Sequence, residues 1–499
     1  MKGSEVSVIT VRKGLFAYLF FCCCIVDSLS GQVILRDDTV SGHVDLDEVT
    51  VSARRREEPV VPVQKLSGEM LDQLSSHSVA DAMRYFSGVQ IKDYGGVGGL
   101  KTIDVRSMGS NHLGVFYDGI EVGNAQNGTV DLGKFSMEQV EEISLYNGQK
   151  SEIFQSAKDF GAAGTLYIKT RRPQFRSGKN YNVEATLKAG TFSLANPSIL
   201  FEHKLTEDIH LSANAEYLYA DGKYHFRYRR VYPSGETAWD TTAVRQNSDV
   251  EAYRVEAGLF GYLPSGKWHL KGYFYQSERG IPCAIVNNVW QNVQRQWDRN
   301  AFVQGNFTQT ITTGYDLQVS GKYSNDWMRY LDDDTITMYI DNRFTQQEVY
   351  ISMAHRLCLT GSNSVIPRAR TYRLNWDVDI SADYQWNKLE SDMSNFVNPK
   401  RNTVLVAVAT QLYWKYLKAQ ASLLTTLVYD RLTVPSIEIP KASRQKPQLT
   451  PAVFLSYQPY LKEELFLRAF YKRIFRMPTF NDLYYTDIGN ISLLPEYTT

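Results

Sequence analysis

The sequence predicts a small α/β domain followed by an antiparallel transmembrane β-barrel that is incomplete at its C-terminus. Long segments with period-two alternation of apolar and polar residues fill the second half of the chain, and short and long connections alternate between them. Aromatic residues make up 13% of the 499 residues, yet the mean hydropathy is only −0.33. In a membrane barrel, apolar side chains that face lipid alternate with polar ones that face inwards, which keeps the mean hydropathy low. A high aromatic content with a low mean hydropathy is therefore typical of a membrane barrel.

Charge and residue clustering exclude several classes of function. The formal net charge is zero, which gives no reason to expect a nucleic-acid partner. No arrangement of nucleophile and base, and no cluster with metal-ligand spacing, stands out. The sequence therefore predicts no enzyme, no cofactor and no metal site.

Residues 1–30 are expected to be a secretory signal peptide. Basic residues open the chain, Leu15–Val26 is an unbroken apolar stretch, and small residues follow it. An uncleaved anchor helix is the alternative, but the stretch is short for a membrane span.

The five cysteines do not indicate a disulfide framework. Cys22, Cys23 and Cys24 would leave with the signal peptide, and only Cys283 and Cys358 would remain. Two cysteines make neither a disulfide framework nor a zinc site, so packing or an incidental loop thiol is expected.

Residues 31–59 are predicted to be a flexible segment. Within it, Asp47–Ala53 is β-branched and favours an extended backbone, whereas Arg54–Pro59 is charged and ends in a proline that does not continue a sheet. A short strand on a flexible leash is suited to pairing with the sheet edge of another protein. An ordinary first strand is the alternative.

Residues 60–173 are predicted to form a compact α/β domain. Ser78–Tyr85 has helical spacing, and a capping box at Ser136–Gln139 is expected to open a second short helix. Asp118-Gly119 is a turn signal. The expected strands are Val89–Lys92, Ile103–Arg106, Val115–Tyr117, Glu142–Tyr146 and Thr165–Thr170.

Residues 174–499 are predicted to form the barrel. Apolar and polar residues alternate over 181–189, 209–219 and 374–386. The expected strands of roughly 9 to 15 residues suit a tilted crossing of the bilayer. Aromatic clusters at Tyr273–Tyr275 and Tyr413–Tyr416 are expected to lie in interfacial girdles.

The connections indicate which ends of the strands face outwards. Long loops of outer-membrane barrels are extracellular and short turns periplasmic. The expected short turns are 205–208, 264–267, 312–314 and 415–417. The expected long loops are 220–251, 278–299, 332–343, 387–401 and 431–448, and the turn at 360–370 is longer than the pattern requires.

About thirteen strands are expected by Phe475. An odd, open set would leave a sheet edge unsatisfied in lipid. The sequence is therefore expected to lack the last part of its barrel, through a truncated gene model or, alternatively, because a second polypeptide completes it.

This order of segments resembles that of the TonB-dependent transporters. The resemblance is also local. Ser107 departs from it, since glycine is usual there, and Gly164-Thr165 stands where a glycine pair is frequent. The matching segments are Glu48–Val51 for the TonB box, Val105–Gly109 with Val115–Ile120 for the plug signature, Phe160–Thr170 for the last plug strand, and Arg476–Tyr485, Gly489-Asn490 and Leu494–Glu496 for a barrel signature familiar from cobalamin and siderophore receptors.

The resemblance implies a location, partners and a mechanism. The protein would lie in the outer membrane of a Gram-negative bacterium, surrounded by its lipid, with residues 60–173 as a plug. A small-molecule nutrient would settle on the outer face of the plug. Proton-motive force would then move the plug through TonB, which pairs with the box as an added strand. The box residues are Asp47, Glu48, Val49, Thr50, Val51 and Ser52.

Candidate ligand contacts lie in three polar segments of the plug. The first is glycine-rich and lacks the Gly-Lys-Ser/Thr run of a phosphate-binding loop. Asp332–Asp334 is a weaker candidate for calcium, since a solvated charge run is the simpler interpretation. The plug candidates are Tyr94, Gly95, Gly96, Asn111, His112, Asn124 and Asn127.

The first functional hypothesis is therefore a TonB-dependent importer of cobalamin or a ferric siderophore. A passive porin or a surface adhesin is the alternative from another class. A glycan receptor of the starch-utilisation type is a third, but it would need an extra domain before the box and a longer barrel.

Overall fold

The computed structural model describes residues 59–74, 76–176, 178–282, 293–334, 338–360, 374–433, 446–460, 465–486 and 488–499, all within one compact unit, Glu58–Thr499. The expected signal peptide, the leash up to residue 58 with its box, Cys283 and most of the turn at 360–370 lie outside these residues. Among the described helices, none has the length and apolar character needed to cross a membrane.

The N-terminal domain, which we call the plug, is built on a five-stranded sheet in the order β1-β6-β7-β4-β5. β4 runs parallel to β7, and β2 and β3 form a separate hairpin. The expected strands are present, although β3 ends at Val105 because Arg106 and Ser107 take left-handed φ values of 53° and 60°. The bounds are β1 Val63–Ser67, β2 Val89–Tyr94, β3 Leu100–Val105, β4 Leu113–Tyr117, β5 Ile120–Glu121, β6 Val140–Tyr146 and β7 Gly164–Thr170.

Short helices connect these strands. The predicted helix over 78–85 is confirmed as α3 followed by η2, and the Ser78 hydroxyl caps it by accepting from the Asp81 N–H. The helix expected from Ser136 is wrong, because Val140 already pairs in β6 and leaves room for one turn only. The bounds are α2 Glu69–Gln73, α3 Val79–Ala82, η2 Met83–Tyr85, η3 Gly96–Gly98, η4 Ser110–His112, η5 Leu132–Lys134 and η6 Ala157–Phe160.

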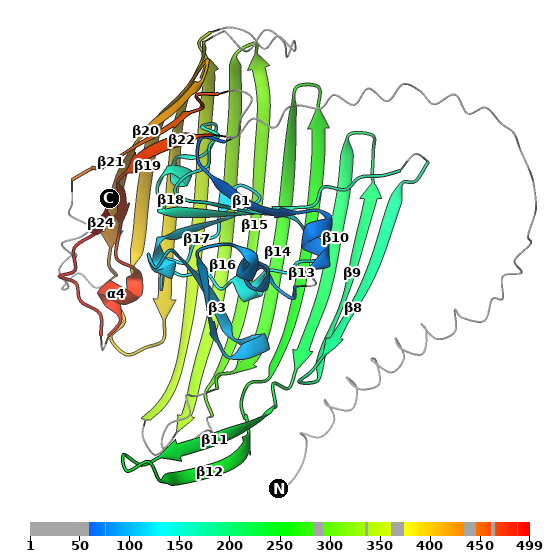
Figure 1. Ribbon diagram of the computed structural model, residues 1–499, viewed down its shortest axis with the longest axis vertical. Coiled ribbons are helices and arrows are strands. Elements are labelled where there is room, and N and C mark those ends of the chain that lie inside the picture. Colours follow the sequence, from blue (N-terminus) through cyan, green and yellow to red (C-terminus); the bar gives the residue numbers. More distant parts are fainter. Residues whose placement is uncertain are drawn as a thin grey trace, which may run out of the picture. The chain divides into compact units, whose positions relative to one another are not determined.

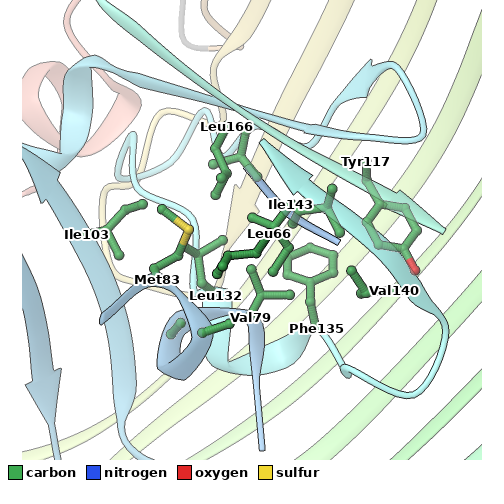
Figure 2. Close-up of a cluster of buried hydrophobic side chains, with 14 of the residues drawn as sticks. Leu66, Val79, Met83, Ile103, Tyr117, Leu132, Phe135, Val140, Ile143 and Leu166 are labelled. Carbon is green, nitrogen blue, oxygen red and sulfur yellow. The ribbon is translucent and has the colours of Figure 1, made fainter. Parts of the chain in front are cut away.

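Side chains from the sheet and the helices of the plug meet in one apolar core, shown in Figure 2. Met83, Ile143 and Leu166 are completely buried in it. The same cluster continues into Tyr273 and Phe302 of the following sheet. The plug therefore shares its core with the structure around it instead of closing on itself.

The second part, which we call the wall, is a thirteen-stranded sheet in which every pair is antiparallel (Figure 1). This confirms the expected count. Within the described residues β8 and β22 each pair with one neighbour, so the sheet is open between them. The bounds are β8 Tyr181–Gly190, β9 Leu194–Lys204, β10 Ile209–Ala220, β13 Val250–Leu263, β14 Gly266–Gly280, β15 Arg295–Thr312, β16 Tyr315–Asp334, β17 Met338–Cys358, β18 Asn375–Ser391, β19 Lys400–Trp414, β20 Leu417–Arg431, β21 Gln448–Tyr457 and β22 Leu467–Lys472.

The two faces of the wall differ as the alternation predicts. In β18, Asp379, Ser381 and Asp383 are buried towards the plug, whereas Ile380 and Tyr384 are exposed on the other face. Successive side chains of a strand point to opposite faces, so one face carries apolar residues for lipid and the other carries polar residues for the plug.

The four expected short turns are confirmed by the strand bounds. The loop expected over 220–251 contains a hairpin of β11 (His225–Val231) and β12 (Thr237–Val244), which lies beyond the ends of the long strands in Figure 1. The loop expected at 332–343 is mostly strand, because the β16 ladder continues as far as the Asp334–Met338 pair.

The girdle predicted at Tyr273–Tyr275 is wrong. Tyr273 and Tyr275 lie mid-strand on the buried face of β14 and pack on the plug. At the other predicted girdle, Trp414 and Tyr416 are exposed at the end of β19 and in the turn that follows it. An aromatic cluster in a strand thus contains residues of both faces, which sequence position near a strand end does not distinguish.

The segment after β22 folds along the wall at the long-loop end. It contains β23 Ile474–Arg476, α4 Phe480–Tyr484 and β24 Glu496–Thr498. Thr479 and Asp482 form a reciprocal capping box at α4. Phe480 and Leu483 are buried in an apolar cluster with Phe344, Leu389, Phe396, Val397 and Tyr484.

Val408 tests the lipid-facing surface. It points outwards from the middle of β19, and Val408→Arg should destabilise the wall by roughly 2–4 kcal/mol, because the charge would lie near the centre of the bilayer. Tyr339→Arg, at the outer end of β17, should cost about 1 kcal/mol or less. Urea unfolding in lipid vesicles measures the free energy of unfolding of both variants. Equal losses of stability would contradict the placement of Val408 near the centre of the bilayer.

Candidate functional site

Three of the predicted site residues, Asn111, His112 and Asn124, line one cavity of about 240 Å³ between the plug and the wall. Plug residues 111–115, 121–125, 128, 130, 158 and 161–163 form one side of it. Strands β17 to β21 and the segment from β23 onwards form the other. The polar wall residues that line it include Glu348, Gln385, Asn387, Arg401, Thr403 and Thr426.

An Asx turn presents the plug residues to this cavity. The Asn124 side-chain oxygen accepts hydrogen bonds from the N–H groups of Gln126 and Asn127, at 2.9 and 3.2 Å. Gly128 closes the turn at a φ of 75°, a conformation that favours glycine. Gln126 N–H also donates to the Gln346 side chain at 3.0 Å, which fixes the turn against β17.

Charged groups at the cavity are paired within the protein. Lys158 lies 3.2 Å from Glu121, and Arg401 lies 2.8 Å from the fully buried Asp430. Burial disfavours the Lys158 ammonium, but Glu121 outweighs this and raises its pKa above the ordinary value. These side chains therefore hold the walls of the cavity together at neutral pH.

Glu348 and Arg476, which also line the cavity, pair with Lys322 at 2.6 Å and with Glu496 at 3.0 Å, and the other polar groups of the lining carry no charge near pH 7. Burial, assisted by Arg476, lowers the pKa of the His112 imidazole below its ordinary value, although Glu496 lies 3.4 Å away. Asn111 and the carboxamides of Gln385 and Asn387 add hydrogen-bonding groups without charge. The cavity can therefore recognise a solute by hydrogen bonds.

The other predicted plug residues do not reach this cavity. Tyr94 is exposed at the tip of the β2–β3 hairpin, and Gly95 and Gly96 follow it at φ values of 144° and 74°. That tip packs towards Pro282, at the end of β14, and away from the other candidates. Asn127 is exposed and accepts a hydrogen bond from Thr129 N–H. Ligand contact at these four residues stays a prediction.

Sequence analysis missed the wall residues of the cavity. Asn387, Arg401, Thr403 and Thr426 lie on the plug-facing side of their strands. The period-two alternation assigns each of them to that face. It does not say which strands stand opposite the Asn111 and Asn124 segments, because this depends on how the plug is seated.

Lys271 is the centre of one buried contact that seats the plug. Its ammonium lies 2.7 Å from Asp118, donates to the Thr170 hydroxyl at 2.6 Å, and lies 3.8 Å from Glu256. Tyr117 donates to Glu256 at 2.6 Å. Lys271 more than offsets the effect of burial on Asp118 and lowers the pKa of that carboxyl.

A second buried group lies nearer the long-loop end of the same strands. Lys134 of the plug lies 3.2 Å from Asp298 of β15, and Arg279 of β14 lies 3.2 Å from Asp131 of the plug. Tyr273 donates to the Lys134 carbonyl at 2.7 Å. Two ion pairs and a hydrogen bond thus join the η5 segment to β14 and β15.

No group of three or more His, Cys, Asp or Glu side chains in the described residues could hold a metal ion. Asp332 and Asp334 lie in β16, where the Asp332 carboxylate accepts from the Gln294 side chain at 2.7 Å and from Asp334 N–H at 3.3 Å. The residues proposed as a coupling segment, Asp47–Ser52, lie outside the described part of the chain.

Comparisons with known proteins agree with this architecture. Residues 55–162 match the family of the TonB-dependent Receptor Plug Domain. The vitamin B12 transporter BtuB of Photobacterium profundum is 29% identical over 150 residues, which are 29% of this chain and 23% of that relative. The chain thus aligns with about a quarter of the length of that transporter.

Solved structures share the fold at low sequence identity. The siderophore receptor PiuA from Acinetobacter baumannii has a TM-score of 0.61 at 11% identity, over 88% of this chain and 68% of its own. The copper transporter OprC has a TM-score of 0.63 at 12% identity, over 88% and 67%. Both likenesses concern the plug and the wall together.

Lys271 tests how the plug is seated. Lys271→Met should weaken the seating by about 3–5 kcal/mol, because it leaves Asp118 and Glu256 buried without their cation. Lys267→Met, an exposed position on the same strand, is the control. The measurement is the urea concentration at which protease cleaves the plug in membranes. Equal resistance of the two variants would show that the Lys271 contacts do not hold the plug.

Proposed function

We propose that this chain is a TonB-dependent receptor of the Gram-negative outer membrane and that it imports a scarce nutrient by energy-coupled movement of its plug. The observation that carries the proposal is the hydrogen-bonding cavity between plug and wall. A ligand held there contacts both parts at once. It can therefore respond to, and influence, how the plug is seated.

The coupling segment in this proposal is Asp47–Ser52, which precedes the plug by a short leash. An extended β-branched segment can add a strand to the sheet of TonB in the periplasm. The first described residues after the leash are tied down, since Val61 N–H donates to the Ser151 hydroxyl at 2.9 Å. A pull on the leash would thus reach the part of the plug that contains Ser151.

Thermodynamic coupling between ligand binding and plug movement sets a physical requirement for such a receptor. A ligand shifts the plug between seated and released states only if its contacts differ between these states. A ligand bridging Asn111 of the plug and Asn387 of the wall meets this requirement, because release separates the two residues. Proton-motive force then supplies the work of breaking the seating contacts.

We propose cobalamin as the first ligand to test and a ferric siderophore as the second. Arg401 is engaged by Asp430 and Arg476 by Glu496, so uncharged groups dominate the free polar surface of the cavity. Carboxamides complement the amide-rich periphery of cobalamin better than the anionic oxygens of most ferric siderophores. The relative from Photobacterium profundum, a vitamin B12 transporter, supports the same order.

Deletion of Asp47–Ser52 tests the coupling. Uptake of cobalamin or ferric siderophore should fall to background while surface binding persists, because the deletion leaves the plug and the cavity intact. Deletion of six other leash residues, Arg36–Ser41, is the control and should leave uptake unchanged. Undiminished uptake without the box would favour a passive porin instead.

Asn111→Trp tests the cavity. The indole would occupy the space between plug and wall, so the affinity for the imported ligand should fall about tenfold or more. Asn127→Trp is the matched control, because Asn127 is equally exposed on the plug but does not line the cavity. Equilibrium binding to outer-membrane vesicles measures both, and equal affinities would exclude this cavity as the binding site.

A further inference from the structure

The plug is held unequally on its two sides. Towards β13, β14 and β15 the contacts are buried ion pairs and short hydrogen bonds around Lys271, Arg279 and Lys134. An aromatic cluster joins Tyr117 of the plug to Tyr273 and Phe302 of the wall, whose rings stack at 4.7 Å. Breaking buried charge pairs of this kind is costly, so this side forms a firm attachment.

Towards β18, β19 and β20 the contacts are weaker. Among the described residues no ion pair joins the plug to these three strands. Gln411 and Gln420 donate to the carbonyls of Ser151 and Lys150 at 3.3 and 3.4 Å, which is long for a hydrogen bond. The apolar contact here is a separate cluster of seven buried residues, smaller than the main core, formed by Ile153, Ala157 and Phe160 of the plug with Leu405, Ala407, Ala409 and Leu424 of the wall.

One carboxylate makes the strongest contact on this weaker side. Asp383 of β18 accepts from the N–H groups of Ala157 and Lys158, at 3.1 and 2.7 Å. These residues begin η6, next to the cavity. Asp383 also accepts from the Tyr350 hydroxyl at 2.8 Å, which fixes its orientation. It therefore holds the plug to the wall directly below the cavity.

Beyond Asp383 the interface contains buried polar groups that have no hydrogen-bond partner among the described residues. Both carboxylate oxygens of Asp379 and the Ser381 hydroxyl make no hydrogen bond of standard geometry, and Asp379 and Ser381 are fully buried. The Gln155 carboxamide of the plug is likewise buried and unpartnered. Native proteins usually satisfy such groups with water or another partner. Unpartnered buried atoms also occur on β14 and β15, for example at His269 and Gln304, so the difference between the two sides lies in the ion pairs.

These groups form a row along one strand. Asn387 and Gln385 line the cavity, and Asp383, Ser381 and Asp379 follow on the same face towards the short-turn end. Alternate residues of a strand are in line on one face, so the row is continuous. It leads from the cavity towards the periplasmic side.

We propose that the ligand leaves the cavity along β18 to β20, where the plug segment 149–160 moves away from the wall while the plug stays attached to β13–β15. This proposal rests on the proposed import function. In it Asp383 is a positioning residue: it holds η6 at the wall until the plug is pulled. Gln155, Ser381 and Asp379 then face the opened passage and offer hydrogen bonds to the moving ligand.

Cysteine labelling tests the route. Ser381→Cys and, as the matched buried serine on β14, Ser277→Cys are made with Cys283 and Cys358 replaced by Ser. Cells are treated with a small, water-soluble methanethiosulfonate during cobalamin or ferric siderophore uptake. Labelling at 381 should rise about tenfold when ligand and proton-motive force are both present, and labelling at 277 less than about twofold. An uncoupler should abolish the rise.

Experiments in the same cells distinguish a failure of the proposed route from a failure of the proposed function. If uptake is normal but position 277 is labelled as fast as position 381, or position 381 does not respond, the route is wrong. If the receptor without Asp47–Ser52 still imports the ligand, the proposed function is wrong instead. The labelling pattern and the uptake of the box deletion are thus independent measurements.

Substitution of Asp383 tests its role. Asp383→Ala should raise labelling at position 381 about fivefold without ligand or energy, because the η6 N–H groups lose their acceptor, and Asp383→Asn should raise it less. Asp377→Ala, on the same face near the start of β18, is the control. Heat-modifiable migration on gels reports whether each wall assembles. Unchanged labelling in an assembled Asp383→Asn or Asp383→Ala variant would overturn the role of Asp383.

Discussion

The pairing of every backbone N–H and C=O group inside lipid is the constraint on which the rest of this structure depends. Water is absent there, so strands must hydrogen-bond to neighbours along their whole membrane length. Between its two edge strands, β8 and β22, the wall meets this with ladders such as the one between β16 and β17, which pairs twenty residues of each strand. Alternation then follows, because each strand has one side in lipid and the other towards the plug.

The plug is the consequence of that second face. Inward side chains of the wall are polar or charged. Their burial by the plug costs little only where hydrogen-bond or ion-pair partners are available to them. On β14 and β15 several of these side chains form buried ion pairs with the plug, as around Lys271 and Arg279. On β18 some groups, such as Asp379, have no hydrogen-bond partner among the described residues. In the proposed exit route, the strands whose ion pairs hold the plug and the strands from which it moves away belong to one sheet.

Sequence patterns predicted what depends on neighbours along the chain. The strand count, the outward side of β18 and the helix over 78–85 all follow from the spacing of apolar residues along the chain. The β16–β17 extension was not predicted, because Asp332–Asp334 has turn-like composition and only the cross-strand ladder keeps it extended.

The candidate site was predicted only in part for the same reason. Asn111, His112 and Asn124 were identified as polar plug segments, but their wall partners are more than two hundred residues away in the chain. Tyr273 was assigned to a girdle because an aromatic residue suits both an interface with lipid and a buried contact with Tyr117. To decide between these two positions for an aromatic residue, one must know how distant elements pack together. A local sequence pattern does not contain that information.

The hairpin between β10 and β13 has a consequence for how this sequence can change length. A single inserted residue within β18 would turn Ile380 inwards and place Asp379 in lipid, so strand interiors do not tolerate it. Between Ala220 and Val250, by contrast, the chain adds a complete β-hairpin, yet these two residues remain partners in the ladder. Growth at the strand ends leaves the register untouched. New surface can therefore evolve there independently of the membrane-spanning frame.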